Sequence, residues 1–250
     1  MKELLKKLIF PTLHLIRKIL TIIKINALPN ISPPSVEVKI APSSAYDVFR
    51  KEELLNCYNH FKKYFKEVIF LDHWGIKEYS IKKAVENDKT FQDTYLEFGV
   101  SRGVSINFLS KFIKTNIYGF DSFVGLREDW VGSTLAKGHF DWKGQVPKTN
   151  KNVLLIKGWV QDTLPNFLKD KKPVINFVNM DMDTYKTSKF VLEQIKPYLK
   201  KNSIVLFDEL YNYSGWSVGE YKALTETFNE NEYKFLSFDK SGASAVIQII

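Results

Sequence analysis

The sequence predicts an α/β protein with a mostly parallel sheet, helices on both faces and an antiparallel hairpin at its C-terminal end. From residue 94 onward, short β-rich runs alternate with helical patterns, as in proteins built from strand–helix–strand units. The runs are almost continuously apolar, which is typical of parallel strands that are covered on both faces. Only the turn residues 239–242 separate the last two runs, and this spacing indicates a hairpin.

Residues 1–26 are expected to form a basic amphipathic helix, kinked at Pro11. Six basic side chains and one acidic side chain give this segment +5 of the net charge of +8. Such a helix suits peripheral contact with an anionic membrane, and packing on the body of the protein, an oligomer contact and a secretory signal are the alternatives. No apolar run reaches the length of about 18 residues that a membrane span needs.

The next two segments differ in their proline content. Residues 27–44 hold four of the nine prolines, so we expect an extended linker. Residues 45–93 are expected to form a helical N-terminal cap, because apolar side chains recur at helical spacing over 45–66 and a second helical pattern lies within 75–88. The main domain then covers residues 94–250.

Seven strands are expected in this main domain, with helical segments between the first five of them. The expected strands are 94–98, 116–120, 152–156, 174–180, 203–207, 234–238 and 245–249, and the expected helices are 103–114, 163–169 and 186–199.

Ligands of such sheets bind beyond the carboxyl ends of the strands. Gly99 and Gly103 follow the first strand and permit a tight turn close to a ligand. A dinucleotide site would need glycine at positions 101 and 104, where Ser101 and Val104 stand, so an NAD-dependent sugar oxidoreductase is disfavoured. After the second strand, Asp121 could accept hydrogen bonds from ribose hydroxyls, or could simply cap a turn. After the third, residues 157–163 offer an apolar wall that would suit adenine, or a helix cap.

Four carboxylates follow the fourth and fifth strands. Asp181 and Asp183 end one strand, and Asp208 and Glu209 end the next. These groups would repel one another if they were left unpaired at neighbouring strand ends. A bound Mg²⁺ or Ca²⁺ would relieve the repulsion, and simple exposure at the surface is the alternative.

Five phrases carry a resemblance to a known family: LEFGVSRGVS, YGFDSFVGL, IKGWVQDTLP, MDMDTY and IVLFDELYNYSGW. In this order, over residues 94–250, they resemble class I S-adenosylmethionine-dependent methyltransferases, and within these the TylF/MycF-type sugar O-methyltransferases. The resemblance implies a Rossmann-like fold with a seven-stranded sheet, S-adenosyl-L-methionine as cofactor and Mg²⁺ as a metal ion.

The resemblance also implies a role for each matching residue. The cofactor would be bound by Glu97, Gly99, Gly103 and Ser105 at its methionine end, by Asp121 at its ribose, and by Val160, Gln161 and Asp162 at its adenine. Mg²⁺ would be bound by Asp181, Asp208 and Glu209, although the family usually has aspartate where Glu209 stands. Asp183 would be the general base, and His139 is an alternative base.

The implied function is O-methylation of a sugar hydroxyl in a bacterial surface glycan or a glycosylated natural product. We expect the acceptor pocket in the stretch 122–147, where Arg127, Trp130, His139, Phe140 and Trp142 cluster. We expect a cytoplasmic protein, with residues 1–26 allowing contact with the inner membrane face or the formation of a homo-oligomer. A membrane-tethered binding protein without activity is an alternative. Residues 27–250 are nearly neutral, which argues against nucleic acid as a partner.

Overall fold

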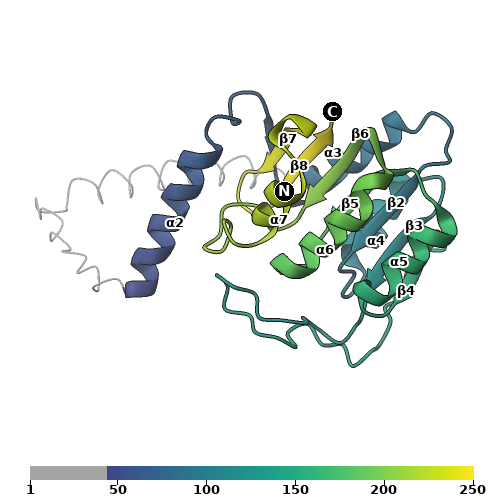
Figure 1. Cartoon of the computed structure of the whole chain (residues 1–250), viewed down its shortest axis with the longest axis horizontal. Helices are drawn as coiled ribbons and strands as arrows, with labels where there is room; N and C mark the ends of the chain where they lie inside the picture. The colour runs from purple at the N-terminus through teal and green to yellow at the C-terminus, as the bar shows by residue number, and fades with distance from the viewer. Residues whose placement is uncertain (1–43) are drawn as a thin grey trace, which may run out of the picture. The chain divides into compact units, whose positions relative to one another are not determined.

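An eight-stranded sheet forms the centre of the protein (Figure 1). The computed structural model describes residues 44–250, so the basic helix expected at 1–26 and all but the last residue of the proline-rich segment lie outside the described residues. The strand order is β1-β7-β8-β6-β5-β2-β3-β4. The strands are β1 (Ile69–Leu71), β2 (Thr94–Phe98), β3 (Ile117–Asp121), β4 (Val153–Lys157), β5 (Ile175–Met180), β6 (Leu199–Phe207), β7 (Tyr233–Asp239) and β8 (Ala245–Ile249).

All neighbouring strands run parallel except at β8, which is antiparallel to both β6 and β7. The expected C-terminal hairpin is therefore confirmed. The expected number of seven strands was one too few, because β1 adds an eighth strand beside β7. This strand lies inside the expected helical cap 45–93, between the helical patterns at 45–66 and 75–88, where no strand was expected. Its three residues are too few to show a strand periodicity in the sequence.

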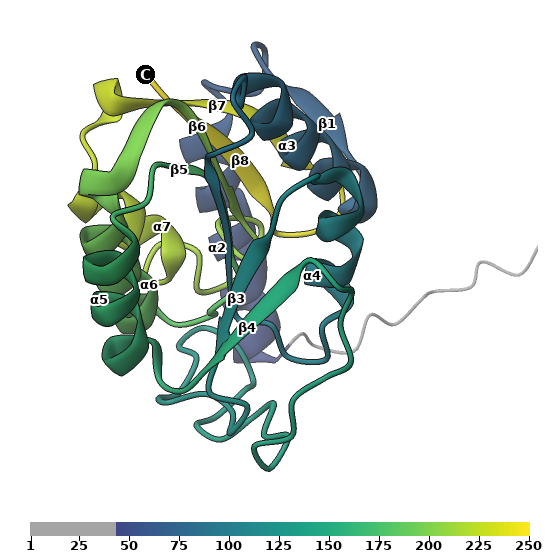
Figure 2. The same ribbon diagram turned by 90° about the vertical axis from the view of Figure 1, so that its right-hand side faces the viewer.

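Helices cover both faces of the sheet (Figure 2). One face carries α3 (His73–Asn87) and α4 (Val104–Leu109), and the other carries α5 (Val160–Lys171), α6 (Tyr185–Ile195) and α7 (Glu220–Thr227). Because successive side chains of a strand point to opposite faces, Phe177 of β5 packs in the core under α3 and Val178 packs in the core under α6. All six residues of β5 are buried, as expected for a central parallel strand.

The N-terminal helix of the described residues, α2 (Ala45–Phe61), is joined to the rest by its last turn. The helix begins with a capping box, in which Ser44 and Asp47 satisfy each other's backbone N–H groups. At the other end, Phe61 is fully buried and its ring contacts the rings of Trp216 and Phe238. Within residues 44–250, no helix is both long enough and apolar enough to cross a membrane.

The residues that follow the strands are positioned by the sheet itself. The backbone N–H of Gly99 donates to the carbonyl oxygen of Phe120, and that of Asp181 donates to Phe98, both at 2.9 Å. The N–H of Asp208 continues the pattern by donating to Met180 at 2.9 Å. The segment between β3 and β4 lies at the same edge of the sheet (Figure 2). The candidate site residues therefore stand on a rigid edge.

Candidate active site

A glycine is required where β2 turns toward α4. Gly99 has φ of +87°, and a Cβ atom there would lie 1.6 Å from the carbonyl oxygen of Asp181. No other residue fits this close approach between the ends of β2 and β5. Gly103 has φ of +76° and caps the N-terminus of α4. The two glycines thus shape the turn, and only Gly99 lines a cavity.

Asp121 holds this turn from the end of β3. Its Oδ2 atom accepts hydrogen bonds from the backbone N–H groups of Val100 and Ser101 at 2.9 and 2.7 Å. Its Oδ1 atom accepts from the N–H of Phe123 at 2.6 Å. An ionised carboxylate can accept about four hydrogen bonds, so one acceptor position stays available for a ligand.

Glu97 is fully buried at the end of β2. Ser105 Oγ donates to its Oε1 atom at 2.8 Å, and Asn179 Nδ2 donates to its Oε2 atom at 3.2 Å. Burial raises the pKa of Glu97 to about 7, against the opposing effects of Ser105 and the charge of Lys77. Glu97 lines neither cavity at this edge, so its described contacts position Ser105 and Asn179.

Two adjoining cavities open at the carboxyl edge of the sheet. The first has a volume of about 320 Å³ and runs from the glycine turn to the strand ends of β3, β5 and β6. The second lies on the side of α3 and α4. Ser101, Phe140 and Asp181 line both, so the two cavities meet at these residues.

The structure brings most of the expected residues to these cavities and leaves four of them outside. Gln161 does not line either cavity; it accepts a hydrogen bond from Arg127 at 2.7 Å, and Asp162 is exposed beside it. The first cavity is lined by Gly99, Asp121, Val160, Asp181, Asp183 and Glu209; the second by Ser105, His139, Asp181 and Asp208; and neither by Glu97, Gly103, Gln161 or Asp162.

Three of the four expected carboxylates meet at the ends of β5 and β6. One oxygen atom each of Asp181, Asp208 and Glu209 lies within 4.8 Å of the other two, and we call these residues the acidic triplet. Removal from water and the charge of Asp208 raise the pKa of Asp181 and of Glu209 well above their usual values.

Asp183 stands apart from the triplet in its backbone and its burial. It has φ of +63°, which is uncommon for a residue other than glycine, and its side chain is buried against the first cavity. Burial, followed by the negative charge of Asp208, raises the pKa of Asp183 to about 7. A carboxyl group with this pKa can take up a proton near neutral pH.

Lys77 of α3 is a site residue that the sequence analysis missed. Its ammonium group forms an ion pair with Asp208 Oδ1, and its side chain is 2% exposed. Burial acts to raise the pKa of Asp208, but the charge and the hydrogen bond of Lys77, together with smaller contributions from His73 and Glu209, lower the pKa of Asp208 below its usual value. The sequence contains one signal for this role: Lys77 falls on the same helix face as the buried residues Ile81 and Ala84.

Glu220 of α7 is the second missed residue, because the helix itself was not predicted. Its side chain is fully buried. Its two oxygen atoms accept hydrogen bonds from Ser188 Oγ and from the backbone N–H of Glu209, both at 3.3 Å. Burial, together with the charge of Asp183, raises the pKa of Glu220 to about 8. The position of Glu220 on one helix face with Ala223 and Leu224 indicates its burial.

The acidic triplet fits a divalent cation. Its donors are carboxylate oxygens, which Mg²⁺ and Ca²⁺ prefer. The Oε2 atom of Glu209 is removed from solvent and has no hydrogen-bond partner, so it is free to bind a cation. Glu209 therefore offers a free carboxylate oxygen at the position where the family usually has aspartate.

Comparisons relate the chain to known methyltransferases. Residues 96–210 match a family described as "Methyltransferase domain". A crystal structure of CalS11, described as a calicheamicin methyltransferase, is 26% identical with a TM-score of 0.56, over 79% of this chain and 85% of CalS11. The apo structure of CalS11 is 24% identical with a TM-score of 0.51, over 79% and 86%. The O-methyltransferase NovP is 16% identical with a TM-score of 0.48, over 70% and 78%. No curated protein sequence matches the chain.

The family match begins in β2 and ends just after the acidic pair that follows β6. It therefore contains the glycine turn, Asp121 and all four carboxylates. The likeness to CalS11 extends over most of both chains. These findings identify the central part of this protein as a class I S-adenosylmethionine-dependent methyltransferase domain.

Proposed function

We propose that the protein transfers a methyl group from S-adenosylmethionine to a sugar hydroxyl. The cofactor would lie in the first cavity, with its ribose at Asp121 and its adenine beside Trp159 and Val160, which line that cavity. Its methionine end would extend over the junction at Ser101 toward Ser105. This placement uses the glycine turn, where Gly99 allows a ligand to approach the backbone.

The acceptor would bind beside the cofactor, under the segment 122–147. This one segment supplies Trp130 and Phe140 to the first cavity and His139, Phe140 and Trp142 to the second. Aromatic rings stack on the apolar faces of sugars, and carboxylates accept hydrogen bonds from sugar hydroxyls. CalS11, described as a TDP-rhamnose 3'-O-methyltransferase, supports a sugar in a glycan or a glycosylated natural product as the acceptor.

The observation that carries this proposal is the placement of Asp183. Its carboxyl group is buried, faces the cofactor cavity and has a pKa raised to about 7 by burial. Asp183 would take the proton of the acceptor hydroxyl while the hydroxyl oxygen forms a bond to the methyl carbon. The bond between sulfur and that carbon breaks in the same step. The products are a methyl ether and S-adenosylhomocysteine.

Asp181, Asp208 and Glu209 would hold a divalent cation, which is Mg²⁺ in this proposal. When bound, the ion would lower the pKa of an acceptor hydroxyl and so make it a better nucleophile. The triplet itself keeps negative charge at this edge of the sheet, and Asp183 stays close enough to it for their charges to interact.

Calorimetric titration of S-adenosylhomocysteine, with Mg²⁺ and again with a chelator, tests the cofactor site. We expect micromolar binding. Incubation with S-adenosylmethionine and TDP-rhamnose or other nucleotide sugars, followed by mass spectrometry, tests the acceptor class. We expect a product that is heavier by one methylene unit. Cofactor binding without methylation of any sugar, together with methylation of a catechol or a protein, would contradict the sugar assignment.

A further inference from the structure

One carboxylate of the acidic triplet already pairs with a basic side chain of the protein. Lys77 reaches from α3 to Asp208, and its ammonium group is almost completely removed from solvent. The same Asp208 oxygen also accepts a hydrogen bond from Ser244 Oγ at 3.2 Å. Among the described residues, Lys77 is the only basic side chain that forms an ion pair with any member of the triplet.

The position of Lys77 has a direct consequence for a divalent ion. An ion bound by all three carboxylates would share Asp208 with the ammonium group. Two positive charges at such short range repel each other strongly, and more so where water is excluded. The ammonium group also takes up Oδ1 of Asp208, one of the two oxygens through which this carboxylate could bind an ion.

We infer that Lys77 competes with the divalent ion for Asp208 and keeps the ion affinity of the acidic triplet low. The inference rests on the metal site of the proposed function. It assigns a role to a residue outside the family match, since Lys77 precedes residue 96. With no ion bound, the ammonium group neutralises part of the negative charge of the cluster. Ion binding then requires Lys77 to leave Asp208 or to accept the repulsion.

Binding of Mn²⁺ to the full chain, followed by electron paramagnetic resonance of the free ion, tests this inference. Lys77→Met removes the charge and keeps an unbranched apolar stem. We expect it to bind Mn²⁺ about 10-fold more tightly than the unaltered protein, or more tightly still. Asp208→Asn added to Lys77→Met should remove the gain. The matched control is Lys82→Met on the same helix, where an exposed lysine pairs with Glu78, and its Mn²⁺ affinity should not change.

An unchanged or weaker Mn²⁺ affinity in Lys77→Met would overturn the inference, and so would an absence of Mn²⁺ binding in both proteins. Thermal unfolding checks that each variant folds, and Lys77→Gln serves as a second neutral variant if Lys77→Met does not. Titration of S-adenosylhomocysteine into the same samples separates the two proposals. Failure of this titration would contradict the cofactor site. Absence of Mn²⁺ binding in every variant would contradict the metal site of the proposed function, whereas an unchanged or weaker Mn²⁺ affinity confined to Lys77→Met would contradict only the role of Lys77.

Discussion

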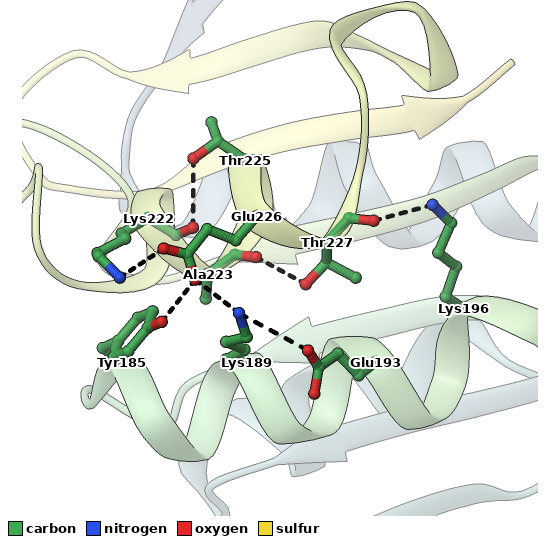
Figure 3. Close-up of polar contacts among 9 residues, drawn as sticks. All are labelled: Tyr185, Lys189, Glu193, Lys196, Lys222, Ala223, Thr225, Glu226 and Thr227. Atoms are coloured by element: carbon green, nitrogen blue, oxygen red, sulfur yellow. Dashed lines mark hydrogen bonds and ion pairs between the residues drawn. The ribbon is translucent and has the colours of Figure 1, made fainter.

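Two glutamates of α7 show opposite behaviour within one short helix. Glu226 is exposed and accepts hydrogen bonds from Tyr185 at 2.5 Å and from Lys189 and Lys222 at 2.6 Å (Figure 3). These three bonds lower its pKa to about 2. Glu220 is fully buried near the acidic triplet and has no basic partner among the described residues, so burial raises its pKa to about 8.

The two glutamates differ in pKa because their surroundings differ, although the residue type is the same. On the α6–α7 surface, Lys189 and Lys222 both pair with Glu226, and these exposed pairs are screened by water (Figure 3). At the strand ends, Lys77 is the ion-pair partner of one of several neighbouring carboxylates. The negative charge of Glu226 is therefore balanced by lysines at the surface. The carboxylates at the site have fewer basic partners, so a bound cation or a proton would reduce their negative charge.

The largest effect is expected when Asp183, the carboxylate that we assign to proton transfer, is made neutral. Asp183→Asn should lower kcat by about 100-fold or more, because the amide cannot take the proton of the acceptor. Binding of S-adenosylhomocysteine should stay within about threefold, since Asp121 and the glycine turn are untouched. Glu226→Gln is the matched control and should keep full activity. Normal turnover in Asp183→Asn would show that another group, such as His139, accepts the proton.

Glu220→Gln should change stability with a defined pH dependence. Because folding raises the pKa of Glu220 from 4.5 to about 8, the folded state binds the proton more tightly, and stability falls as pH rises between these values. Glutamine removes this loss. At pH 9, with a chelator present, we expect the variant to be more stable by roughly 1–3 kcal/mol in urea unfolding. Near pH 4 the two proteins should unfold alike; a difference that is constant with pH would contradict the assignment.

Glu226→Gln should have the smallest effect. We expect Tm to fall by less than about 2 °C at low salt, and the difference should vanish in about 1 M NaCl, because exposed ion pairs are screened. The pH dependence has the opposite sign to that of Glu220. The contribution of Glu226 is present above pH 4.5 and is lost as pH falls toward 2, where its carboxylate takes up a proton. A shift that survives high salt would mean that packing, rather than charge, is what changed.

Most of the sheet could be predicted from the sequence, because its central strands are long apolar runs between turn residues. The range expected for the first of them, 94–98, is that of β2, and Asp181 does meet Asp208 and Glu209 at one edge. Parallel strands with helical crossovers place their carboxyl ends together, so sequence order alone was enough to predict this meeting.

The missed features depend on contacts between distant segments. β1 is defined by its pairing with β7 rather than by its own three residues. Lys77 belongs to α3, and nothing in the local sequence shows that this helix lies beside Asp208. Glu220 resembles an ordinary helical glutamate until α7 is packed against α6. The helix face can indicate that such a charge is buried, but its partners are known only once the neighbouring element has been placed.

The pairing of β1 also bears on how the protein folds during synthesis. β1 is made before every other strand in the sheet, yet its single neighbour is β7, which is made next to last. β7 in turn reaches the centre of the sheet only through β8 and β6. β1 therefore has no partner strand on the ribosome until β7 emerges. A nascent chain halted before residue 233 would expose the unpaired strand β1 and the unpaired edge of β6 to chaperones or to aggregation.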